Sequence, residues 1–212
     1  MFDRRSSDII VFGRRLAIIE LDERSRMKQP TTSTLTLEQY HAFSKLLHWL
    51  MAILMIAMLA FGLLLGEVPQ AWRGFAYGLH KSTGILILML VAVRILWRLV
   101  KPAPAMPADF STLVKYGAHG AHLTLYALMI LMPLSGWWMS TVAGRSVEFY
   151  GLFTLPPLGD VDPEYKDYSK AVHTWIGYAL IALISLHAGA ALWHHFIRKD
   201  ATLRRMLPHF NK

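Results

Sequence analysis

The chain has 212 residues, of which 54% are hydrophobic and 17% charged, and it contains no cysteine. Soluble domains have a smaller apolar share and a larger charged share, so insertion into a membrane is the simplest explanation. The lack of cysteine excludes disulfides, iron–sulfur clusters, thiolate metal sites and covalently attached c-type haem. The formal net charge of +8 comes mostly from basic residues that flank apolar segments, which favours membrane orientation over nucleic-acid binding.

The N-terminal stretch is polar and rich in arginine, and its apolar runs are too short for a signal peptide. We expect residues 1–39 to form a mobile cytoplasmic extension, and Met27 is a second plausible start of translation. The domain that carries the function is expected at residues 40–208, followed by a short C-terminal tail at residues 209–212.

Four apolar segments follow the extension, and each is long enough for a transmembrane helix of about 20 residues. Three of them contain no Asp, Glu, Lys or Arg, namely 46–66, 116–144 and 171–197. The remaining segment is interrupted by Lys81 and Arg94, which lie far enough apart along a helix for both side chains to reach a membrane face. The predicted fold is therefore an all-α membrane protein, a four-helix bundle. Its predicted spans are about 44–66, 79–99, 114–140 and 170–197.

The basic residues beside these spans indicate an orientation. One side of the membrane collects the larger and more tightly placed group: Lys45, Arg94, Arg98, Lys101, Lys115, Arg198, Lys199, Arg204 and Arg205. Cytoplasmic loops carry the excess of Lys and Arg. We therefore expect both termini in the cytoplasm and the long third connection, residues 141–170, on the outer side.

Histidines are unusually frequent in or beside the spans, and two of them share the last span. His173 and His187 are 14 residues apart, which returns them to within about 40° of one helix face. They are separated by about 21 Å along the axis, too far to share one metal ion. This spacing favours two stacked sites, one toward each membrane surface.

Each site then needs a partner from another helix. With the expected orientation, His80 lies level with His173 toward the outer side, and His48 lies on the same half as His187. A zinc site needs about four ligands, whereas haem iron needs only two axial ligands beyond its pyrrole nitrogens. Two haem groups are therefore expected. Gly84 and Gly177 lie one turn beyond their histidines and would either admit a flat macrocycle or serve ordinary helix packing.

Several sequence pieces resemble the bacterial cytochrome b561 family of small inner-membrane dihaem proteins, over about residues 40–208. The pieces are HWL at 48–50, LHKSTG at 79–84, VRILWR at 93–98, AHGAH at 118–122, VEFYGLFTLPPL at 147–158, HTWIGY at 173–178 and LHAGAALWHHFIRKDATLRRMLP at 186–208. The resemblance implies two haem b groups, with axial ligands at the positions of His48, His80, His173 and His187. It also implies a multi-pass protein of the bacterial inner membrane that transfers electrons, usually with ubiquinone.

The physiological donor is left open by this resemblance. Some members of the family are oxidoreductases that oxidise superoxide outside and reduce ubiquinone inside. Others are non-enzymatic membrane anchors that carry electrons for a periplasmic redox partner, for which the third connection would be the docking surface. A third hypothesis is a haem-free proton transporter or sensor, which the absence of acidic residues inside the spans disfavours.

Further residues are candidates for supporting roles. His194 lies near the face of His187 and roughly 10 Å beyond it, so we expect it to bond a quinone carbonyl and relay a proton, with Trp193 in the pocket wall. An interfacial histidine at a helix end is the simpler alternative. Arg94 is expected to bind a propionate of the inner haem, and Arg98 is a second choice that fits membrane anchoring better.

Four more residues have less definite expected roles. Lys81, beside His80, is a candidate for binding the outer haem or for attracting an anion such as superoxide. His119 and His122 lie on one helix face. They are expected to bond neighbouring helices or propionates, with axial ligation in place of His48 or His187 as the less favoured alternative. His195 points away from that face and receives no role.

Overall fold

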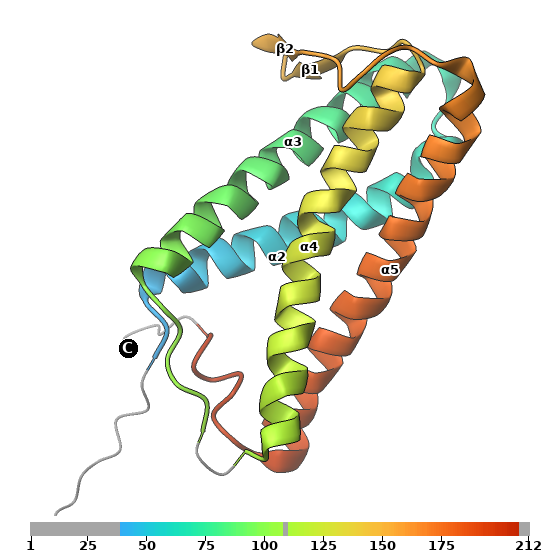
Figure 1. Cartoon of the computed structure of the whole chain (residues 1–212). Coiled ribbons are helices and arrows are strands. Elements are labelled where there is room, and N and C mark those ends of the chain that lie inside the picture. Colours follow the sequence, from blue (N-terminus) through green and yellow to red (C-terminus); the bar gives the residue numbers. More distant parts are fainter. Residues whose placement is uncertain (1–38, 108–109, 208–212) are drawn as a thin grey trace, which may run out of the picture. The chain divides into compact units, whose positions relative to one another are not determined.

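The computed structural model describes residues 39–107 and 110–207, and most of them lie in four long helices (Figure 1). The predicted N-terminal extension, apart from Gln39, and the predicted tail at residues 209–212 lie outside the described residues. The same holds for Met27 and the question of where translation starts.

The four helices are α2 (Ala42–Leu64), α3 (Gln70–Val100), α4 (Thr112–Val142) and α5 (Lys166–Trp193). Each is long and apolar enough to cross a membrane, which confirms the prediction of an all-α protein with four such helices. The main difference is that α3 begins at Gln70 rather than near residue 79. Pro69 lies immediately before it, and the more polar turns that follow extend this helix beyond its apolar segment.

The helices meet in an apolar core to which all four contribute. Its buried members are Met51, Met55, Ile87, Val91, Leu125 and Leu180. Large apolar side chains on other faces, such as Ile53, Leu96 and Leu186, are exposed. In a bilayer these faces meet lipid, and the helices associate through close packing rather than through exclusion of water.

A short β-hairpin lies in the third connection, where the all-α prediction has no strand. Strands β1 (Val147–Phe149) and β2 (Phe153–Leu155) pair antiparallel. Three-residue strands carry too little periodicity to be recognised in a sequence. The hairpin is attached to α3, because Ser82 Oγ donates to the carbonyl oxygen of Glu148 at 2.8 Å and accepts from Tyr150 N at 3.0 Å. Figure 1 shows it at one end of the helices, which we call the hairpin end.

The opposite end is closed by the segment that follows α5, and we call it the C-terminal end. A π-helical turn, η3 (His194–Arg198), continues α5, and the chain then returns to α2. Trp49 Nε1 donates to the carbonyl oxygen of Met206 at 2.9 Å, and Lys45 Nζ donates to that of Leu207 at 3.1 Å. The orientation with both termini in the cytoplasm stays a prediction.

Candidate haem-binding sites

The hairpin-end site is formed by one histidine from α3 and one from α5. The rings of His80 and His173 face each other with their centroids 6.4 Å apart and their planes at 81°. An apolar pocket adjoins both rings, and it is lined by Met55, Met58, Leu59, Gly84, Ile87, Met132 and Pro133. A lining of this kind suits the apolar face of a macrocycle.

The C-terminal-end site repeats this arrangement with α2 and α5. The ring centroids of His48 and His187 are 6.2 Å apart, and the ring planes make an angle of 78°. Two imidazoles that bind one metal ion from opposite sides, with bonds of about 2 Å, have centroids roughly 6 Å apart. The structure therefore brings together the two pairs chosen from the sequence, each at a separation that fits one haem iron.

Two glycines that the sequence analysis missed allow the rings of the hairpin-end site to lie where they do. A Cβ at Gly136 of α4 would lie 3.0 Å from Cε1 of His173, and one at Gly62 of α2 would lie 3.2 Å from Cε1 of His80. Contacts between helices cannot be found from spacing within one helix. At Gly177, the glycine singled out on α5, a Cβ would instead lie 3.3 Å from Cε of Met132, which indicates ordinary helix packing.

Arg94 occupies the C-terminal-end site, as expected from its register on α3. Its Nε donates to Tyr126 Oη at 3.0 Å, and its Nη2 lies 3.3 Å from His48 Nδ1. The third nitrogen, Nη1, is buried and has no hydrogen-bond partner among the described residues. A guanidinium inside a membrane is stabilised by an anion, and a haem propionate would supply one. The free Nη1 would give such a propionate a hydrogen-bond donor, so Arg94 fits a haem at this site.

The contact with Arg94 also constrains His48. A guanidinium only donates hydrogen bonds, so Nδ1 of His48 accepts, and the proton of the neutral ring lies on Nε2. Binding of iron through Nε2 therefore requires Arg94 to leave Nδ1. An anionic group in the site would accept a stronger hydrogen bond from the guanidinium than the neutral imidazole does.

The other candidate residues near the C-terminal end differ in whether they face the His48–His187 pair. The His122 ring lies 5.4 Å from that of His187, so it faces the C-terminal-end site as a third histidine. His119 Nδ1 instead bonds the carbonyl oxygen of Lys115 in its own helix at 2.7 Å. The Arg98 guanidinium lies over the Tyr40 ring, 5.8 Å from its centroid, and it is also near enough to His122 for their charges to interact.

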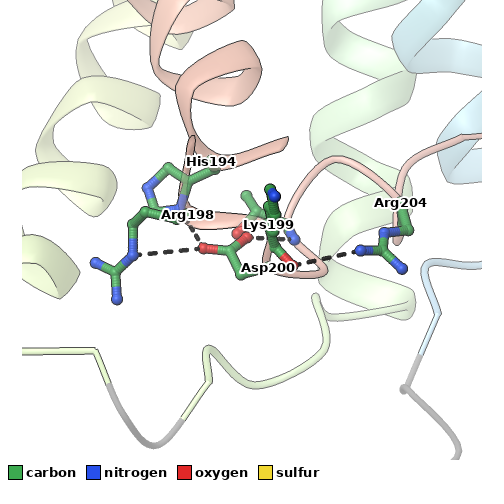
Figure 2. A network of polar contacts seen from close by, with 6 residues as sticks. His194, Arg198, Lys199, Asp200 and Arg204 are labelled. Carbon is green, nitrogen blue, oxygen red and sulfur yellow. Dashed lines mark hydrogen bonds and ion pairs between the residues drawn. The ribbon is translucent and has the colours of Figure 1, made fainter. Parts of the chain in front are cut away.

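His194 has a partner that the sequence analysis did not consider. Its Nδ1 lies 2.5 Å from Oδ2 of Asp200, and Arg198 Nε lies 3.8 Å from the same oxygen (Figure 2). Burial raises the pKa of Asp200, but hydrogen bonds from His194 and Thr202 outweigh it and leave this pKa below its usual range. The carboxylate is thus charged, and it holds His194 with Nδ1–H as donor and Nε2 turned away. The ring also packs against Trp193, with centroids 5.2 Å apart.

Lys81 points toward the hairpin rather than along the helix. Its Nζ donates to the carbonyl oxygen of Ser146. It lines a surface cavity at the hairpin end together with Arg73 and Arg145, and Glu148 is the one acidic residue among the lining side chains. This cavity carries an excess of positive charge beside the helix that holds His80.

Comparisons with known proteins agree with this arrangement. The family model described as prokaryotic cytochrome b561 matches residues 39–209. The chain is 37% identical over 177 residues to "Cytochrome b561 homolog 2" of Escherichia coli K12, covering 82% of this chain and 94% of that protein. It is 34% identical over 162 residues to "Probable superoxide oxidase CybB" of Yersinia pestis (76% and 92%). It is 33% identical over 174 residues to "Cytochrome b561 homolog 1" of E. coli K12 (76% and 93%).

The contact at Gly136 generates a first prediction. Gly136→Ala should lower occupancy of the hairpin-end site, because the added methyl group displaces the His173 ring. Haem content per chain, measured by absorbance of the purified protein, reports the loss. Gly117→Ala on the same helix is the matched control, since a Cβ there meets nothing within 4 Å. Equal haem content in both variants would contradict the prediction.

Proposed function

The chain belongs to the prokaryotic cytochrome b561 family of multi-pass electron-transport proteins of the bacterial inner membrane, and we propose that it is a dihaem b-type cytochrome that moves electrons between an outer donor and ubiquinone. The observation that carries this proposal is the pair of facing histidines at each end of α5, with centroids 6.4 and 6.2 Å apart. The family implies haem b, so the haem-free transporter or sensor is not retained.

The proposed ligands are His80 and His173 at the hairpin end, and His48 and His187 at the C-terminal end. Bound haem would supply a reversible one-electron centre at each position. The chain's own contribution is to hold the two centres about 21 Å apart along α5, one near each membrane surface, and to surround them with apolar side chains. Electrons can then cross the bilayer in short steps.

We assign the hairpin end to the outer side and the C-terminal end to the cytoplasm. The support is the density of basic residues at the C-terminal end, where Arg198, Lys199 and Arg204 follow α5. Both termini are then cytoplasmic.

Quinone reduction needs protons as well as electrons, and the C-terminal end offers a group for this task. The Asp200 carboxylate holds Nδ1–H of His194, which leaves Nε2 to exchange a proton with a bound quinone oxygen. Trp193, 48% exposed, offers an apolar wall for the quinone ring.

Superoxide is our preferred donor at the outer side. One relative is named as a probable superoxide oxidase, and the cavity lined by Arg73, Lys81 and Arg145 would attract a small anion. The alternative is an electron-carrying subunit for a periplasmic redox protein. It is favoured by the hairpin tip, where Leu152 is 77% exposed and available for a partner's surface.

The proposal predicts a selective loss. His173→Ala should remove the hairpin-end haem, keep the other, and abolish ubiquinone reduction by superoxide, because each haem has its own axial pair. Haem spectra and anaerobic quinone reduction by the purified protein measure both effects. Loss of the other haem instead would show that the pairing is wrong. A wild-type protein that binds two haems yet does not react with superoxide would favour the electron-carrying subunit.

The proposed proton relay through His194 predicts a slower quinone reaction without loss of haem. His194→Ala should keep both haems and slow the oxidation of reduced haem by ubiquinone at least tenfold, since a general acid–base group contributes about 10²–10⁴-fold. His119→Ala, which removes an exposed histidine bonded within its own helix, is the control. Normal quinone kinetics in His194→Ala would make His194 a residue of the helix end, and loss of a haem would make it a ligand.

A further inference from the structure

The second ring nitrogen of His173 has a polar partner on another helix. Ser135 of α4 is buried, and its Oγ lies 2.9 Å from His173 Nδ1. No family motif or spacing argument pointed to this serine. It follows Pro133 by two residues and stands directly before Gly136, against which the same ring packs.

The direction of this hydrogen bond can be worked out from the neighbouring carbonyl group. Ser135 Oγ donates to the backbone oxygen of Met132 at 2.8 Å. A serine hydroxyl has one proton, so the same Oγ accepts from His173. The proton of the His173 ring is therefore on Nδ1, and the lone pair of Nε2 is free.

The ring is held on two sides by consecutive residues of α4. The ring lies close to Gly136, where a Cβ would be only 3.0 Å from Cε1 and 3.3 Å from Nδ1 of His173, so a glycine is needed for the ring to lie there. Ser135 binds the Nδ1 edge, and the Met132 carbonyl oxygen lies near the same edge. Rotation of the ring by half a turn would break the hydrogen bond, so the one orientation that keeps it also fixes the direction of Nε2.

The partner ring lacks a comparable anchor. His80 Nδ1 is buried and has no hydrogen-bond partner within residues 39–107 and 110–207. His80 is positioned by packing instead, with Phe61 at a centroid distance of 5.9 Å and Gly62 close to Cε1. In the hairpin-end site, a hydrogen bond at Nδ1 therefore influences the basicity of the His173 ring and not that of the His80 ring.

We propose that Ser135 is a positioning residue for the hairpin-end haem: it fixes the Nδ1–H tautomer of His173, aims Nε2 at the iron and lowers the midpoint potential of that haem. The inference rests on the proposed function, which makes His173 an axial ligand. A hydrogen bond accepted from Nδ1–H makes the imidazole a more basic ligand. A more basic ligand stabilises ferric over ferrous iron, so the bond favours passing the electron onward.

The test compares three variants of the full-length protein in detergent. Ser135→Ala removes the acceptor, and Ser135→Thr keeps a hydroxyl at the position. Thr174→Ala is the matched control, because it removes an exposed hydroxyl next to His173 that donates to Lys170 O in its own helix. The readouts are haem content, redox titration, and the EPR signal of the ferric haem, which depends on the orientation of the axial rings. His173→Ala identifies which titration step belongs to the hairpin-end haem.

The expected result is a higher midpoint potential and an altered EPR signal for the hairpin-end haem in Ser135→Ala. Ser135→Thr should return both toward the wild type, and the other haem and Thr174→Ala should be unchanged. Selective loss of the hairpin-end haem, restored by Ser135→Thr, would equally support the inference. An unchanged potential and EPR signal, or the same loss in Thr174→Ala, would overturn it. Failure of the proposed function would show differently, as a wild-type protein without two haems.

Discussion

Helix α5 carries two histidines on one face, and the arrangement of the other helices depends on providing a partner for each. In the proposed function each pair of imidazoles binds one iron, which requires two helices at a set distance. Helix α3 brings His80 to His173, and α2 brings His48 to His187. The glycines at positions 62 and 136 let the helices approach these rings closely. The apolar core between the two pairs, with Met55 and Leu180, then holds the ends in register.

Polar groups inside a bilayer have no water to bond, and this constraint accounts for the surroundings of each site. Ser135 satisfies both His173 and a backbone carbonyl, and the Arg94 guanidinium bonds His48 and Tyr126. Four buried side-chain nitrogen or oxygen atoms of the described residues lack a hydrogen-bond partner. Two of them, Nδ1 of His80 and Nη1 of Arg94, lie at the places where we propose that haem binds, and the other two, on His195 and Thr202, lie in the segment after α5.

The sequence predicted the parts of this account that depend on one helix at a time. Apolar segments without charged residues identified the spans. Helical periodicity predicted how far along the helix axes His173, His187 and Arg94 lie. Features formed between helices could not be predicted from the sequence. They include the close packing of His173 on Gly136 and the hydrogen bond between Ser135 and His173. The pairing of His194 with Asp200 was missed because it depends on a turn after α5 in which Lys199 has a positive φ of 56°. The short hairpin strands were missed for lack of periodicity.

The central claim is that each chain holds two haems in series, and the haem stoichiometry of the purified protein tests it most directly. A pyridine haemochrome assay, combined with quantitative amino-acid analysis, gives haem b per chain without assuming which residues bind it. We expect two haems per chain, with two steps in the redox titration. One haem per chain, or none, would contradict it.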